Sequence, residues 1–201
     1  MKFIKLVFVM LFTTGFCTYS HSQDVELIKG DATVIAGQTE ILVTFVYDNM
    51  KVGEFTEDLY IKQKRSEYRK PADADKFIAK WKADFKNSHQ PKFIEQFNMY
   101  IKKLKMSAVT DDTTKYMMIV HTNLIDPGYN NKGMYRETLV NLSVDIVESA
   151  SPDNVLATII AEKVAGVGNT TAEAKDQQAR ITNAYGSCGM RIAKLLVKLC
   201  K

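Results

Sequence analysis

The stretch Val140-Asn141-Leu142-Ser143-Val144-Asp145-Ile146 decides the fold class. Its apolar residues alternate strictly with polar ones, which is typical of a β-strand with one buried face and one wet face. Such a strand favours an antiparallel neighbour, because antiparallel sheets commonly leave one face to water. Residues 149–154 then contain the turn, and residues 155–164 are predicted to return as the partner strand.

Two further apolar runs extend this sheet. Residues 41–47 are β-branched and aromatic without polar alternation, which predicts a central strand covered on both faces. Residues 116–121 form another apolar strand, and residues 25–36 are a weakly patterned strand or hairpin. The sheet is therefore predicted to be mixed or largely antiparallel.

Residues 71–105 have the pattern of two short amphipathic helices. Phe77, Trp81 and Phe85 recur every four residues and form one apolar stripe. Residues 87–90 break the pattern, and Pro91 suits the start of a second helix. Two helices joined by so tight a connection are expected to pack antiparallel.

A long C-terminal helix is predicted from the Thr170–Glu173 capping-box spacing to Leu199. Its apolar residues are spaced 4-3-4-3-4 and predict a buried seam of Ile181, Tyr185, Cys188, Ile192, Leu195 and Leu199. Gly186 and Gly189 interrupt this helix, so that it either kinks there or approaches the sheet closely; close approach is favoured. The fold class predicted is an α/β (α+β) sandwich, with the helical pair and this helix packed on the sheet.

Residues 1–22 read as a signal peptide, and residues 23–201 as a single α/β domain. Lys2 and Lys5 precede an apolar run, and Ser20 and Ser22 stand at the small positions of a cleavage site. The chain is therefore expected to be exported, to the periplasm or beyond, with association with the outer membrane as an alternative. Phe16 is a poor residue before a lipidated cysteine, so a soluble product is preferred over a lipid anchor at Cys17.

Catalytic motifs were not found in the mature chain. His89 and His121 lack further ligands at metal-binding spacing, and each reads as a surface or satisfied polar residue. Cys188 and Cys200 lie twelve residues apart on the predicted helix, beyond disulfide reach, and are expected to be free thiols. We therefore predict no catalytic residue, no cofactor and no metal.

Charge is distributed unevenly along the chain. Residues 61–105 contain thirteen Lys and Arg against five acids, a net charge of +8, whereas the rest of the mature chain carries −6. This segment is either a solvated lysine-rich surface or a docking face for an anion. The candidate anion-docking residues are Lys80, Lys82, Lys86, Lys102, Lys103 and Lys105.

About the last ninety residues resemble known proteins. The pieces that carry the resemblance are Tyr116 to Val120, the turn Asp126-Pro127-Gly128-Tyr129, the strand pair, the exit Val164-Ala165-Gly166, and the helix Arg180 to Tyr185 with Ile192 to Lys194. They resemble uncharacterised exported α/β proteins of Gram-negative bacteria. More distantly, their order is similar to the periplasmic domain of CsgG-type curli-secretion lipoproteins. The resemblance implies an envelope location and an α/β fold, but supplies no catalytic residue.

The function expected from the sequence is non-enzymatic binding or assembly in the cell envelope. The partner would be an envelope protein or an anionic surface, without nucleic acid and without a transmembrane segment in the mature chain. A periplasmic module that binds a small molecule or a polyanion is one alternative. A hydrolase with an unrecognised site is another.

The cleavage pattern leads to a first prediction. Export should remove residues 1–22 and leave Gln23 at the mature N-terminus, because Ser20 and Ser22 fit the −3 and −1 positions. N-terminal sequencing of the exported protein tests this, and a lipidated Cys17 at the terminus would contradict it.

Overall fold

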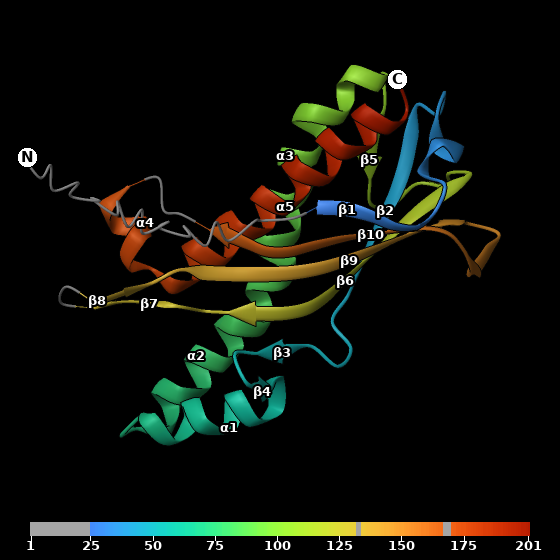
Figure 1. Ribbon diagram of the computed structural model, residues 1–201. Helices are drawn as coiled ribbons and strands as arrows, with labels where there is room; N and C mark the ends of the chain where they lie inside the picture. The colour runs from blue at the N-terminus through green and yellow to red at the C-terminus, as the bar shows by residue number, and fades with distance from the viewer. Residues whose placement is uncertain (1–24, 132–133, 167–169) are drawn as a thin grey trace, which may run out of the picture.

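The computed structural model describes residues 25–131, 134–166 and 170–201. Helices lie over one face of a twisted sheet, and a helical arm extends past the edge of that sheet (Figure 1). The predicted signal peptide and Cys17 lie outside the described residues.

The strands are β1 (Val25–Gly30), β2 (Glu40–Val46), β3 (Lys51–Val52), β4 (Phe55–Thr56), β5 (Ser107–Val109), β6 (Tyr116–Asp126), β7 (Tyr129–Asn131), β8 (Met134–Arg136), β9 (Thr138–Glu148) and β10 (Ser151–Gly166). The helices are α1 (Glu57–Glu67), α2 (Pro71–Asp84), α3 (Gln90–Ile101), α4 (Thr171–Lys175) and α5 (Gln177–Leu199). Shorter helical turns are η1 (Ala32–Ile35), η2 (Phe85–His89) and η3 (Lys102–Leu104).

The main sheet is mixed, as predicted, with the order β1-β10-β9-β6-β2-β5. Strand β9 pairs antiparallel with β10 and with β6, whereas β2 runs parallel to β6 and to β5. Strand β3 continues the parallel pairing at the far end of β6, and β4 pairs with β3. The predicted strand pair at residues 140–164 is confirmed, and β9 alternates between buried and half-buried residues.

Strand β2 does not have the two covered faces that its sequence predicts. Ile41 and Val43 are buried, but Leu42 and Thr44 between them are only half-buried. The helices α3 and α5 cover one face of the sheet, while α1 and α2 lie beyond its edge, next to β3 and β4 (Figure 1). The second face of β2 therefore has no helical layer over it.

The predicted antiparallel helical pair is also wrong. Helix α2 continues through the π-helical turn η2 into α3, so the three form one long rod (Figure 1). Pro91 has no N–H for an α-helical hydrogen bond to the preceding turn, and the wider π-turn accommodates it without ending the rod. Helix α3 packs on α5, and the antiparallel neighbour of α2 is α1, which the sequence analysis missed.

The C-terminal helix is two helices rather than one. Thr170 caps α4 as predicted, but Asp176 is extended and caps α5 by accepting from the backbone N–H groups of Gln178 and Ala179. The predicted seam holds as far as Ile192; beyond it Leu196 is buried while Leu195 is half-buried. A 3.6-residue helix drifts away from a seven-residue repeat, which moves the buried stripe by one position.

The two glycines of α5 allow a close approach, as predicted, but the element that approaches them is α3 and not the sheet. A Cβ atom at Gly189 would overlap the carbonyl oxygen of Phe93. One at Gly186 would lie 3.0 Å from Cγ of Lys92. The helix is continuous through both glycines, so they let two helix backbones touch.

The contact gives a prediction about stability. Gly189→Ala should lower the free energy of unfolding by about 1–3 kcal/mol, because overpacking against the Phe93 backbone outweighs the better helix propensity of Ala. Gly186→Ala is the matched control, since its Cβ meets a flexible side chain, and it should be close to neutral. Urea denaturation measures both. A Gly189→Ala protein as stable as the wild type would contradict the close approach.

The π-turn also buries His89, which the sequence analysis expected to be a surface or satisfied residue. Its side chain is fully buried, stacks on Tyr185 at 5.1 Å and contacts Thr182 Oγ1 through Nδ1 at 2.9 Å. Its Nε2 atom has no hydrogen-bond partner among the described residues. Burial lowers the pKa of His89 from 6.5 to about 4, so the ring is neutral at pH 7.

This pKa predicts acid sensitivity. Between pH 6.5 and 4 the unfolded chain binds a proton at residue 89 that the folded chain does not, so stability falls as the pH falls. The loss from this residue should reach about 3 kcal/mol. His89→Phe keeps a stacked ring and should flatten this part of the stability–pH curve. Equal curves for wild type and His89→Phe would contradict the assignment.

Candidate functional site

The six candidate lysines form two groups. Lys80 and Lys82 lie on α2 and Lys86 on η2, whereas Lys102 and Lys103 begin η3 and Lys105 follows it. Helix α3 separates the groups by its twelve residues, about 18 Å. Lys80 is already paired, with Nζ 2.6 Å from Oδ2 of the buried Asp84. The structure therefore does not bring the six into one face.

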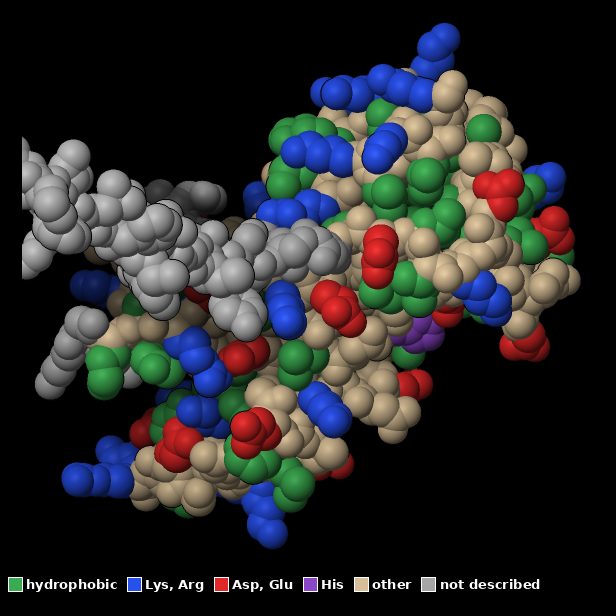
Figure 2. Space-filling model, viewed as in Figure 1, with side chains coloured by type: hydrophobic (Ala, Val, Ile, Leu, Met, Phe, Trp, Pro, Cys, Tyr) green, Lys and Arg blue, Asp and Glu red, His purple; other side chains and the backbone are tan. Residues whose placement is uncertain are grey.

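The second group meets lysines from elsewhere in the chain. Where α3 and α5 end side by side, a depression of about 320 Å³, here called the lysine pocket, is lined by Tyr100, Lys103, Lys194, Val197, Lys198 and Lys201. Lys194 Nζ lies 4.6 Å from the centre of the Tyr100 ring. None of these lining side chains is acidic. Figure 2 shows Lys and Arg side chains gathered over this end of the molecule.

Sequence reasoning missed three of the four lysines in this pocket. Lys194, Lys198 and Lys201 are spaced by four and three residues, which places them along one side of a helix. That spacing was the available signal. Only the packing of α3 on α5, however, brings these three lysines beside Lys103.

A simpler reason for these lysines is the helix dipole. Cations are stabilised near helix C-termini, and Lys198 lies in the last turn of α5. The dipole explains single lysines at each helix end. It does not explain why they surround one concavity with an aromatic ring at its wall.

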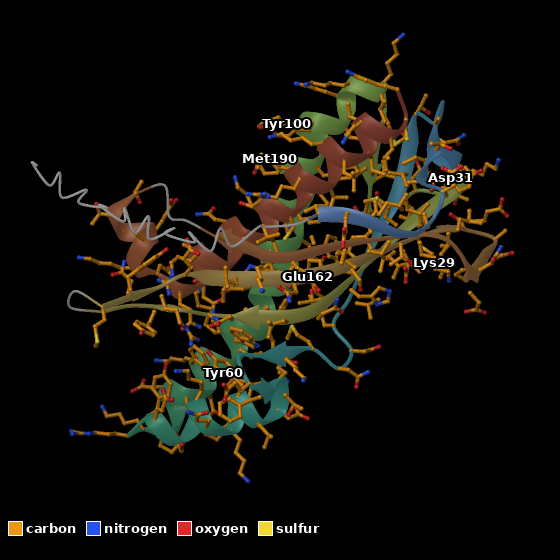
Figure 3. All side chains as sticks on the ribbon, viewed as in Figure 1. Lys29, Asp31, Tyr60, Tyr100, Glu162 and Met190 are labelled. Carbon is orange, nitrogen blue, oxygen red and sulfur yellow. The ribbon has the colours of Figure 1, made fainter. Side chains whose placement is uncertain are left out.

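A second depression lies at the other end of the helical rod, and it is here called the hairpin cleft. Its volume is about 670 Å³. It is lined by Val52, Gly53, Glu54, Phe55, Tyr60, Gln63, Lys64, Glu67, Leu124, Asp126, Pro127, Gly128, Tyr129, Arg136 and Gln177. Figure 3 labels Tyr60 and Tyr100, which mark the opposite ends at which the two depressions lie.

Tight turns build the wall of this cleft. Gly128 has φ +55°, and a Cβ there would overlap the carbonyl oxygens of Arg136 and Glu137, so only glycine fits. Asp126 Oδ1 accepts a hydrogen bond from the backbone N–H of Gly128. The predicted Asp126–Tyr129 turn is thereby confirmed, and it leads directly into the β7–β8 hairpin.

The buried Arg180 holds this turn against α5. Its guanidinium donates to the carbonyl oxygens of Pro127 and Ala174 and to Thr138 Oγ1, at 2.9–3.1 Å. Thr138 in turn donates to Pro127 O at 2.7 Å. Nothing in the neighbours of Arg180 along the chain shows that this side chain would be buried.

The described residues give limited support to catalysis. Among them, no cluster of three or more His, Cys, Asp or Glu side chains is placed to hold a metal ion. Burial raises the pKa of the Cys188 thiol, so it is a poor nucleophile, and both described cysteines are free. His121 Nε2 lies 3.5 Å from Asp145 Oδ2 on the half-exposed face of the sheet.

No helix in the described ranges has the length and hydropathy needed to span a membrane.

Comparisons with known proteins give distant likenesses only. No protein family and no curated protein matches the sequence. A PelC dodecamer from Paraburkholderia phytofirmans is 10% identical, with 83% of this chain and 96% of that chain covered and a TM-score of 0.43. A dodecamer of a single-substitution variant of that PelC protein is also 10% identical, with 84% of this chain and 98% of that chain covered and a TM-score of 0.34.

The third structure is a Xanthomonas campestris protein of the DUF330 family. It is 13% identical, covers 48% of this chain and 55% of its own, and has a TM-score of 0.32. No CsgG-type protein is among these three. Likenesses of this size carry no argument about function, which therefore has to be argued from the surface of the molecule itself.

Proposed function

We propose that this chain is a non-enzymatic binding protein of the cell envelope that docks on an anionic phospholipid surface through its lysine pocket. The observation that carries the proposal is the convergence of Lys103, Lys194, Lys198 and Lys201 around one concavity whose lining lacks acidic side chains. Lysine is a common phosphate ligand that acts as a point charge, so this arrangement suits lipid phosphate groups.

A surface suits the arrangement better than a single small anion. Lys102 is next to Lys103 on η3, and Lys105 directly follows η3, so the positive charge of this segment extends beyond the residues that line the concavity. Each lysine close to an anionic bilayer contributes about 1 kcal/mol, and the attraction decays within a Debye length of about 8–10 Å. Several lysines at one end of the molecule therefore add up, whereas Lys80, Lys82 and Lys86 lie too far away to share the same contact.

Export and domain organisation belong to the same proposal. A signal peptide at residues 1–22 would deliver a single α/β domain, residues 23–201, to a compartment bounded by phospholipid. The hydrolase alternative has less support, since the buried Cys188 is a poor nucleophile and the pKa shift of His89 occurs in the core rather than in either depression.

The experiment compares two triple variants that change the net charge equally. Lys103→Gln, Lys194→Gln and Lys198→Gln together remove three of the four positive charges of the pocket. Lys76→Gln, Lys82→Gln and Lys86→Gln together are the matched control, because these three side chains are exposed and Lys80, which pairs with the buried Asp84, is left in place. Sedimentation with vesicles containing phosphatidylglycerol, at low and at high salt, measures binding. The first variant should bind at least tenfold more weakly than wild type at low salt, and the control should bind as wild type.

Three outcomes would contradict the proposal. One is a wild type that does not sediment with anionic vesicles even at low salt. Another is an equal loss of binding in both variants, which would indicate that net charge rather than the pocket causes binding. The third is binding to an acidic polysaccharide but not to the vesicles, which would make the polysaccharide the partner instead of the lipid surface. Thermal melting of each variant shows whether it is folded, and exposed Lys→Gln changes should leave the melting temperature nearly unchanged.

A further inference from the structure

We infer that the hairpin cleft is a second binding site, for an uncharged, hydroxyl-rich ligand such as a segment of a neutral oligosaccharide. The cleft lies where the parallel strands β3 and β6 both end, beside Gln177 in the first turn of α5. In open α/β sheets, the crevice at the carboxyl ends of parallel strands is the usual place for a ligand. Its volume of about 670 Å³ is that of a small-molecule site.

The charged side chains that line the cleft nearly cancel, which disfavours a strongly charged ligand: Glu54, Glu67 and Asp126 stand against Lys64 and Arg136, a net charge of −1. Lys64 Nζ lies 2.8 Å from Glu67 Oε2, and Arg136 Nη2 lies 2.5 Å from Asp126 Oδ1. An anion would have to compete with these carboxylates for Lys64 or Arg136. A neutral hydroxyl donates to the remaining carboxylate lone pairs and accepts from the remaining N–H groups, so both pairs stay intact.

The aromatic residues supply the apolar part of the site. Phe55 and Tyr129 are 42% and 43% exposed and come from two different strands on the wall of the cleft, β4 and β7. The Arg136 guanidinium lies 5.7 Å from the centre of the Tyr129 ring, which supports the ring from one side. Exposed rings beside polar groups suit a ligand that has both C–H faces and hydroxyl edges.

Amide and hydroxyl groups at the cleft are fixed before any ligand arrives. Gln177 Nε2 donates to Tyr60 Oη at 3.1 Å, and burial raises the pKa of Tyr60, so its hydroxyl stays protonated and remains a donor. The Gly128 turn and its Arg180 anchor hold the opposite wall. A preformed wall lowers the entropy lost when a ligand binds.

The chain contains its own reporter for this site. Trp81 is the single tryptophan of the sequence, is fully buried, and lies 5.1 Å from the ring of Tyr60. Its indole N–H donates to Glu57 Oε1 at 2.8 Å, in the first turn of α1. A ligand that moves Tyr60 or α1 should change the fluorescence of Trp81, whereas the lysine pocket lies at the other end of the rod.

The test titrates the purified protein with cellohexaose, maltohexaose and N-acetylchitohexaose while Trp81 fluorescence is measured. At least one should give a saturable change that is unaffected by moderate salt. Tyr129→Ala and Phe55→Ala should weaken that binding at least tenfold. Tyr135→Ala is the matched control: its ring is 53% exposed on the same hairpin but does not line the cleft, so binding should be unchanged.

Several results would overturn the inference. A flat titration with all three sugars would do so, as would a response that Tyr129→Ala and Phe55→Ala both leave unchanged. A response that inorganic phosphate competes away would assign the cleft to an anion instead. The triple variant Lys103→Gln, Lys194→Gln and Lys198→Gln should keep full sugar binding, so that failure of the lysine pocket as a lipid site and failure of the cleft as a sugar site are separate results.

Discussion

The contact between α3 and α5 is the constraint on which the rest of the structure depends. Gly189 lets the two helix backbones meet at Phe93, closer than any residue with a Cβ would allow. Because α2 and η2 continue from α3 without a break, this contact also fixes the direction of the whole rod. One end of the rod then lies beside the last turns of α5, and the other end carries α1 away from the sheet.

Both candidate sites are consequences of that rod. At one end, Lys103 meets Lys194 and Lys198 because the two helices end together. At the other end, α1 stands opposite the β7–β8 hairpin, and the space between them is the hairpin cleft. The Arg180 side chain links this cleft to the core, since it joins the Pro127 turn to the helix that α3 packs against.

The two sites differ in how their charges are arranged, and this difference separates their ligands. The lysine pocket gathers four ammonium groups, and none of the side chains that line it is acidic. Its electrostatic potential therefore attracts anions over a Debye length. The hairpin cleft pairs Lys64 with Glu67 and Arg136 with Asp126, so it offers hydrogen bonds without a strong net field. A protein held to a charged surface at one end and bound to an uncharged ligand at the other would link the two.

The sequence by itself determined the class of the fold. Strict alternation over residues 140–146 fixed β9 and its partner, the Asp126–Tyr129 turn was predicted with its residues, and the mixed sheet followed. These features are local, because a period of two or a glycine with positive φ depends on the chain itself. The lysine pocket, the burial of His89 and the role of Arg180 were decided only by the tertiary structure. Each depends on residues far apart in sequence, and no local pattern records which helix Gly189 will touch.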